Sequence, residues 1–258
     1  MKTKIISLTV MYSLLHFLQA QPIHMAMKAE TFKIPGKEGY NASGLTWNPK
    51  MKMYYTAFAG NSKYPLYAIR ENGEAASGAI PLGFDSRGLW YNTKEKCLQG
   101  NAYYDKGLYK MTIAATGFPV SGEQVYSGQH QPSENSIGAF AEKKKEIWYY
   151  KSGFLYKYKI KDGAFSGSKK LETGTYEISL NNNAMVYTGL KNREIGLYDY
   201  KNNRVLLFSA KSGKLTELWA IPDSTLDYPD SYNISYCNGR FWIFHKSGRE
   251  WRGFTLKK

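Results

Sequence analysis

A single pattern recurs along this 258-residue chain and restricts its fold more than any other feature of the sequence. Each copy starts with a small residue and an apolar pair, followed by a polar turn, an aromatic-rich segment and a Leu-Tyr or similar segment. Short alternating apolar runs separated by turns indicate strands, so each copy predicts a small antiparallel sheet. The pattern is clearest in Gly44-Leu45-Thr46-Trp47-Asn48-Pro49, and the copies begin near Gly44, Gly88, Gly138, Ser179 and Ser235.

Repeats of about 40–50 residues with four short strands each are typical of propeller blades. The fifth copy lacks its fourth strand, while an unassigned strand at residues 30–35 precedes the first copy. Pairing of that N-terminal strand with the last blade would close the ring and remove an open sheet edge. We therefore predict an all-β fold, a β-propeller of five blades. Six blades are the alternative, because residues 178–221 contain one strand more than the other copies.

The first twenty residues are typical of a secretory signal. Lys2 and Lys4 give a basic start, residues 5–18 are mostly apolar, and Ala20 precedes a plausible cleavage point. No other segment is long and apolar enough to suggest a transmembrane span. We expect a signal peptide at 1–20, a flexible leader at 21–29 and a single propeller domain at 30–258. The expected product is a secreted or periplasmic monomer.

The chain has a formal net charge of +14, which attracts polyanions. Its lysines are scattered through turns, so we favour a solvated basic surface, with polyanion contact through that surface as the alternative. Export argues against a nucleic-acid partner. Cys97 and Cys237 occupy different positions within their repeats, so two buried thiols are favoured over a disulfide.

Two of the blade openings resemble those of a known group of proteins. Gly44-Leu45-Thr46-Trp47-Asn48-Pro49 and Arg87-Gly88-Leu89-Trp90-Tyr91-Asn92 are similar to blade openings of secreted NHL-type, gluconolactonase-like and SdiA-regulated-like propellers. The resemblance implies a propeller fold for most of the mature chain. Gluconolactonase-like enzymes hold calcium in the channel with a Glu, an Asn and an Asp. This chain has Asn41-Ala42-Ser43-Gly44 at the first-blade position, with neither Glu nor Pro. We therefore predict no cofactor and no metal, with a channel calcium ion, which this motif does not support, as the alternative.

Propeller ligands usually gather at the channel mouth, on the loops that enter each innermost strand. Aligning those loops on the opening residue places five side chains in one column, and Arg87, Glu134 and Glu177 lie in the same loops. Arg87 could meet a carboxylate or sulfate in a bidentate fork. The alternative is that these polar residues cap strands and bind turn backbone. The predicted ligand-binding residues are Asn41, Asp85, Arg87, Glu134, Asn135, Tyr176, Glu177 and Tyr232.

The sequence contains no nucleophile elbow, phosphate loop or metal-ligand cluster. His130 could act as a general base, and His245 is expected on a strand surface or edge. The pairs Tyr54-Tyr55, Tyr103-Tyr104 and Tyr149-Tyr150 resemble sugar-stacking platforms, but their repeat-periodic placement favours packing between blades. The favoured function is binding of a polar ligand, a glycan or peptide, at the channel mouth. The alternative is a hydrolase or lyase that uses Asp85, Glu134 or Glu177 with His130 or Arg87.

Overall fold

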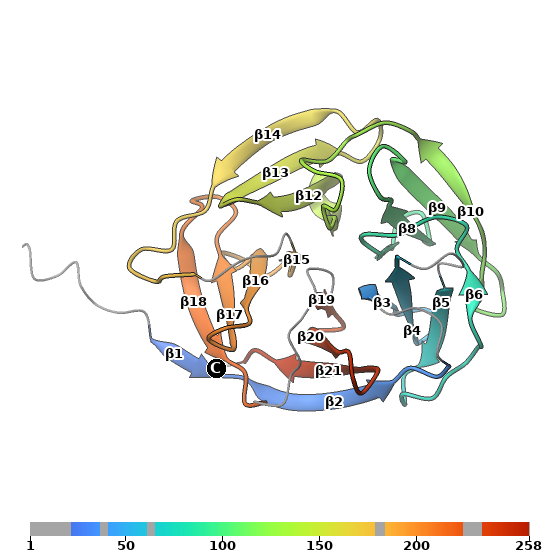
Figure 1. Cartoon of the computed structure of the whole chain (residues 1–258), viewed down its shortest axis with the longest axis horizontal. Helices are drawn as coiled ribbons and strands as arrows, with labels where there is room; N and C mark the ends of the chain where they lie inside the picture. The colour runs from blue at the N-terminus through green and yellow to red at the C-terminus, as the bar shows by residue number, and fades with distance from the viewer. Residues whose placement is uncertain (1–21, 37–40, 61–64, 179–183, 224–233, 258) are drawn as a thin grey trace, which may run out of the picture.

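Five antiparallel sheets surround a central channel (Figure 1). The computed structural model describes residues 22–36, 41–60, 65–178, 184–223 and 234–257. Each sheet is one blade, with its first strand at the axis and its last strand at the rim. The predicted all-β, five-bladed propeller is therefore confirmed. None of the described segments forms a helix long and apolar enough to cross a bilayer.

The blades follow one another along the chain, and each has strands in the order given from axis to rim. Blade 1 contains β3 (Asn41–Asn48), β4 (Met53–Ala59), β5 (Pro65–Arg70) and β6 (Ile80–Pro81). Blade 2 contains β7 (Trp90–Asn92), β8 (Cys97–Asn101), β9 (Leu108–Ile113) and β10 (Pro119–Tyr126). Blade 3 contains β11 (Ala139–Ala141), β12 (Glu146–Lys151), β13 (Phe154–Lys159) and β14 (Phe165–Lys170).

The last two blades include the N-terminal strands. Blade 4 contains β15 (Val186–Tyr187), β16 (Ile195–Asp199), β17 (Arg204–Phe208), β18 (Leu215–Ala220) and β1 (Ile23–Met25). Blade 5 contains β19 (Ile234–Cys237), β20 (Arg240–His245), β21 (Glu250–Thr255) and β2 (Met27–Lys33). The short 3-10 helix η2 (Glu142–Lys144) joins β11 to β12.

The N-terminal strand closes the ring, as the sequence predicted. β2 pairs with β21 in antiparallel register, with Phe32 opposite Trp251. β1 then adds to the rim of blade 4 as a parallel partner of β18. Within the segment 21–29, expected to be a flexible leader, residues 23–25 form β1 and residues 27–29 begin β2. The N-terminal segment therefore ties blade 4 to blade 5.

Five clusters of buried apolar side chains hold the ring together, one between each pair of neighbouring blades. Aromatic side chains dominate them, which explains the high aromatic content, because large rings fill the space between two twisted sheets. Near the axis the backbones approach closely. A Cβ on Gly88 would lie 2.5 Å from the carbonyl oxygen of Gly138, so only glycine fits there.

The up-and-down strand order gives the propeller two faces. The entry face carries the loops that lead into each first strand and the turns between second and third strands. The exit face carries the turns between first and second strands and between third and fourth strands. The loops that the sequence proposed as functional lie on the entry face wherever the structure describes them, at residues 83–87, 133–137 and 175–178.

The structure differs from the sequence interpretation in blade 4. Residues 178–221 do not split into two blades, and the first described strand of blade 4 is β15 at Val186–Tyr187. Residues 179–183 lie outside the described part of the chain. Because the opening residue was misplaced, the column that gave Tyr176 is out of register with those of blades 1 to 3.

The three Tyr-Tyr pairs do not share one environment. Tyr54, Tyr55 and Tyr149 are fully buried between blades, as expected. Tyr104 is 49% exposed in the turn between β8 and β9, so the packing expected for it is wrong. Cys97 and Cys237 are free thiols in different blades.

Candidate functional site

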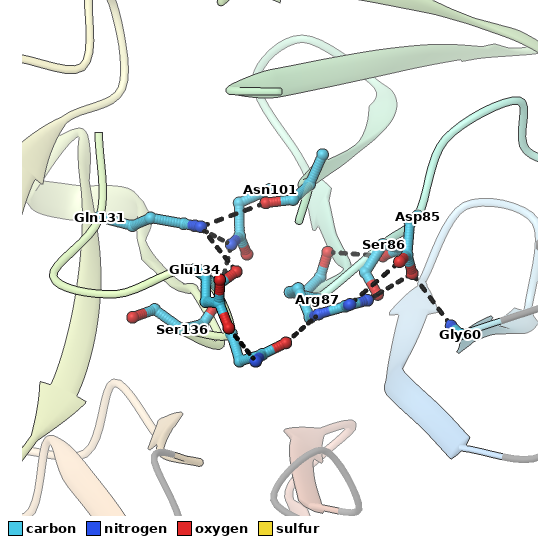
Figure 2. A network of polar contacts seen from close by, with 11 residues as sticks. Gly60, Asp85, Ser86, Arg87, Asn101, Gln131, Glu134 and Ser136 are labelled. Atoms are coloured by element: carbon cyan, nitrogen blue, oxygen red, sulfur yellow. Dashed lines mark hydrogen bonds and ion pairs between the residues drawn. The ribbon is translucent and has the colours of Figure 1, made fainter. Parts of the chain in front are cut away.

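A polar network on the entry face joins four of the predicted site residues from two neighbouring loops. Arg87 forms a two-pronged ion pair with Asp85, and its second prong measures 3.0 Å from Nη2 to Oδ2. Its Nε donates to Oδ1 of Asn135 at 3.1 Å. The Arg87 side chain is only 7% exposed. Figure 2 shows Arg87 beside Asp85 and Ser86, with Gln131, Asn101 and Glu134 facing them.

The network extends outward to a carboxylate in contact with solvent. Asn135 Nδ2 donates to Glu134 Oε1 at 3.3 Å, and the Tyr103 hydroxyl donates to Glu134 Oε2 at 3.3 Å. The Arg87 guanidinium lies 4.6 Å above the centre of the Tyr103 ring. The negative charge of Glu134 raises the pKa of Tyr103, because it disfavours the phenolate. Glu134 is exposed, so its remaining acceptor capacity faces the solvent.

Asp85 is held in place from two sides. Its Oδ1 accepts a hydrogen bond from the backbone nitrogen of Gly60 at 3.0 Å, and its carbonyl oxygen accepts one from the backbone nitrogen of Tyr103 at 2.9 Å. A carboxylate with a bidentate arginine and a backbone donor has little capacity left. The Asp85–Arg87 pair therefore braces the loop rather than offering a free charge.

Gln131, which sequence reasoning missed, organises the second loop. Its buried amide donates to the carbonyl oxygens of Ala102 at 3.3 Å, Tyr104 at 3.0 Å and Glu134 at 3.1 Å. Its Oε1 accepts from Asn101 Nδ2 at 2.7 Å, and Asn101 Oδ1 in turn accepts from the backbone nitrogen of Gly138. The sequence Gly128-Gln129-His130-Gln131-Pro132 gives no sign of this structural role, because Gln131 donates to backbone carbonyl oxygens outside this segment.

Hydrogen bonds with Gln131 and Glu134 hold Tyr104 in an unusual backbone conformation. Its φ is +56°, in the left-handed region that a bulky residue rarely adopts. Its backbone nitrogen donates to the Glu134 carbonyl oxygen at 2.9 Å, and its own carbonyl oxygen accepts from Gln131. The exposed ring lies 6.2 Å from the ring of Tyr103, centre to centre. An aromatic surface, a carboxylate and an amide are thus presented together to the solvent.

The remaining predicted residues lie apart from this network. Asn41 begins β3, and its Oδ1 is buried without a hydrogen-bond partner. Tyr176 donates its hydroxyl to Asp199 Oδ2 at 3.0 Å and packs under Arg204. With Glu177 it lines a separate pocket of about 640 Å³ between blades 3 and 4. Tyr232 lies outside the described residues.

The two histidines that the sequence singled out have occupied ring nitrogens. His130 faces two backbone carbonyl oxygens, those of Gly163 and Ser127, each at 3.0 Å. In His245, Nδ1 lies 2.9 Å from Arg252 Nη2, and Nε2 lies 3.2 Å from the Ser247 hydroxyl. Because Arg252 can only donate, Nδ1 must accept, and Nε2 then carries the proton. Neither ring has a nitrogen available as a general base.

The described residues that line the channel lack the Glu, Asn and Asp side chains that hold calcium in gluconolactonase-like proteins. A cavity of about 80 Å³ on the axis is lined by the first strands of the five blades. Its side-chain oxygens come from Ser43, Thr46 and Ser235, together with the Tyr187 and Tyr236 phenols, and no carboxylate is among the described lining residues. Calcium sites need several carboxylate or carbonyl oxygens. The calcium site of gluconolactonase-like proteins therefore does not fit these residues, and no group of His, Cys, Asp and Glu in the described chain is arranged to hold a metal.

Comparisons with known proteins support the fold alone. No protein-family model matches the chain, and a search of curated proteins finds no match. Among solved structures, the glutaminyl cyclase of Myxococcus xanthus superimposes with a TM-score of 0.62 at 12% identity, over 92% of this chain and 99% of that one. The calcium-binding protein regucalcin of Agrobacterium tumefaciens gives a TM-score of 0.54 at 8% identity, over 93% and 98% of the two chains.

A Bacteroides thetaiotaomicron protein of unknown function gives a TM-score of 0.51 at 9% identity, over 92% of this chain and 75% of that one. Identities this low carry no information about reactions. The three structural matches agree, in architecture only, with the resemblance to propeller proteins that the blade openings indicated.

Proposed function

We propose that this protein is an exported β-propeller that binds a glycan on its entry face. The observation that carries the proposal is Tyr104, an exposed aromatic ring held in a left-handed backbone conformation beside Glu134 and Asn135. Backbone strain of this kind costs on the order of 1–3 kcal/mol and gathers at functional sites.

The chemistry of the cluster suits a sugar. The C–H face of a pyranose packs against an aromatic ring, while its hydroxyls need acceptors and donors at the ring edge. Tyr104 offers the ring, Glu134 offers carboxylate oxygens, and Asn135 offers an amide. All three belong to loops that Gln131 braces, so little conformational freedom remains to be lost on binding.

A hydrolase or lyase is not favoured by any particular contact. Asp85 is neutralised by Arg87, and the His130 ring faces two carbonyl oxygens. Glu134 is the one exposed carboxylate of the network, and a partner acid at a glycosidase-like separation is not among the residues that contact it.

The test is glycan binding by the mature protein on an array of neutral and acidic oligosaccharides, followed by calorimetry with the best one. Tyr104→Ala should weaken binding by roughly 5- to 30-fold, through loss of stacking worth about 1–2 kcal/mol. Phe165→Ala, which removes an equally exposed ring from β14, is the matched control and should leave affinity unchanged.

Product analysis in the same samples separates binding from catalysis. The proposal predicts unchanged oligosaccharide after prolonged incubation. Turnover that Glu134→Gln abolishes while affinity is retained would establish the enzyme alternative. No binding to any arrayed glycan would remove the proposal.

A further inference from the structure

The exit face carries a concentration of basic side chains that the sequence alone did not reveal as a group. Five turns connect the first and second strand of each blade around the axis: residues 49–52, 93–96, 142–145, 188–194 and 238–239, to which we add Arg240, the first residue of β20. Together they contain ten Lys or Arg residues and three Glu residues. We call these turns the basic ring. Its basic members are Lys50, Lys52, Lys94, Lys96, Lys143, Lys144, Lys145, Lys191, Arg193 and Arg240.

Figure 1 shows the five blades arranged around one axis, so the turns that follow the five innermost strands are distributed around it. The backbone nitrogen of Thr93 in blade 2 donates to Glu142 Oε1 in blade 3 at 3.1 Å. Asn238 in blade 5 donates through Nδ2 to the Tyr54 hydroxyl in blade 1 at 2.6 Å. The turns of blades 2 and 3 are therefore in direct contact, and the turn of blade 5 contacts β4 of blade 1 next to the turn at 49–52.

Most lysines of the ring have no acidic partner. Lys52 pairs with Glu71 at 3.5 Å, Arg193 with Glu217 at 3.3 Å and Arg240 with Glu30 at 2.6 Å. Within the described part of the chain, seven lysines of the ring have no carboxylate at ion-pair distance, and all seven are exposed. They are Lys50, Lys94, Lys96, Lys143, Lys144, Lys145 and Lys191.

The acids of the same turns are already engaged elsewhere. Glu95 pairs with Lys110 on β9 at 3.1 Å, and Glu142 accepts hydrogen bonds from Thr93. Glu194 accepts from the backbone nitrogens of Asn192 and Ala210. The positive charge of the ring is therefore left largely uncompensated at the surface.

The backbone shows that lysine occupies turn positions where another residue would be more stable. Lys52, Lys96 and Lys145 have φ values of 50°, 53° and 55°, in the left-handed region. The corresponding turns of blades 4 and 5 have Asn192 and Asn238 in that conformation. Asparagine tolerates it because its side chain binds the local backbone, whereas lysine has no such compensation.

The shape and chemistry of the ring favour a flat partner over a linear one. Lysine is a compact point charge without the planar fork of arginine, so it suits a dense anionic surface better than one bidentate ligand. The tips of five turns around an axis can meet a plane together, whereas a single extended chain would cross only part of the circle. None of the exposed large apolar side chains of the described chain lies in these turns, so insertion into an apolar layer has no anchor here.

We propose that the basic ring docks the propeller on an anionic phospholipid surface, with the exit face against the headgroups and the entry face turned outward. Polybasic clusters bind such surfaces by Coulomb attraction that acts within a Debye length. Binding by this route depends steeply on salt and requires anionic headgroups. It does not depend on the glycan site, because Tyr104 and Glu134 lie on the opposite face.

The experiment measures co-sedimentation of the mature protein with vesicles of phosphatidylcholine containing about one-third phosphatidylglycerol. Pure phosphatidylcholine vesicles and a rise in salt from about 0.05 M to about 0.5 M serve as the reference conditions. The ring variant K94E/K143E/K191E is compared with K33E/K106E/K201E. Both change the net charge equally, at exposed lysines, but the second set lies on the entry face.

The wild type and the entry-face variant should bind anionic vesicles, and the ring variant should bind at least about tenfold more weakly. Equal losses in the two variants would show that net charge alone is responsible and would overturn the proposal. So would failure of the wild type to bind anionic vesicles, or retention on immobilised heparin without vesicle binding, which would assign the ring to a soluble acidic polysaccharide. The neutral variant K94Q/K143Q/K191Q gives the same test if the charge reversals impair folding.

Discussion

The two faces of this propeller differ in how their charged side chains are paired. On the entry face, Asp85 and Arg87 lie nearly out of solvent and satisfy each other, and Asp223 and Arg252 do the same near the closure of the ring, at 2.8 Å. On the exit face, seven exposed lysines stand without acidic partners among the described residues. Paired charge fixes the conformation of a loop, whereas unpaired charge creates a field outside the molecule.

Both faces also hold bulky residues in left-handed backbone, Tyr104 on one and Lys52, Lys96 and Lys145 on the other. Such positions are normally given to Gly or Asn. The comparison suggests that each face gives up some stability for what it displays, an aromatic ring in one case and positive charge in the other. The predictions below test that contrast.

The largest effect is expected from breaking the entry-face ion pair. The Arg87→Met variant removes an ionic partner of Asp85, whose side chain is 18% exposed. Because the Asp85 carboxylate then lacks that compensating charge, the free energy of unfolding should fall by about 3 kcal/mol. Urea denaturation measures the loss. The exit-face variant Lys94→Met should change stability by less than about 0.5 kcal/mol. Equal effects of the two variants would remove the distinction between the faces.

A stabilising effect is expected from relieving the exit-face backbone. Lys96→Asn should raise the free energy of unfolding by about 1 kcal/mol, because asparagine tolerates a φ of 53°. The same variant should bind anionic vesicles more weakly. Lys94→Asn, at a position in the same turn without positive φ, should lose binding without gaining stability. A destabilised Lys96→Asn protein would contradict the reasoning.

On the entry face, Tyr104→Gly should give a smaller gain. Glycine removes the steric cost of a φ of +56°, but it also adds freedom to the unfolded chain, so a net stabilisation of about 0.5 kcal/mol is expected. Glycan binding should be lost at the same time. If the variant is less stable than the wild type, contacts of the Tyr104 ring outweigh the strain, and the argument for a displayed side chain fails.

The smallest effect concerns the ionisation of Tyr103. The charge of Glu134 raises the pKa of Tyr103, so the phenol keeps its proton to a higher pH than an isolated tyrosine. Glu134→Gln removes that charge and should lower the pKa toward its ordinary value. Ultraviolet difference titration, with Tyr103→Phe to identify the signal among 22 tyrosines, measures the change. An unchanged titration would show that the two side chains do not interact in solution.

The sequence predicted the ring and its closure because both depend on local periodicity. Strand spacing marks blades wherever they lie, and a missing fourth strand at one end with a spare strand at the other implies one pairing. The same alignment placed Asp85 and Asn135 in one column, and in the structure both side chains contact Arg87.

The sequence did not predict the positions of residues that depend on contacts between distant segments. β15 is only two residues long, so its opening could not be found by pattern, and Tyr176 and Glu177 line an inter-blade pocket instead. The Tyr103-Tyr104 pair looks like the buried pairs in sequence, yet the Gln131 brace holds Tyr104 at the surface. The lysines looked scattered because only the fold shows that five separate turns share one face.

The pairing of β2 with β21 and of β1 with β18 has a consequence for the order of events in biosynthesis. The strands made first by the ribosome find their partners only among the strands made last, so the emerging chain cannot complete the ring step by step. Contacts between segments so distant in sequence also form slowly. The ring therefore stays open until the strands of the last blade have been made.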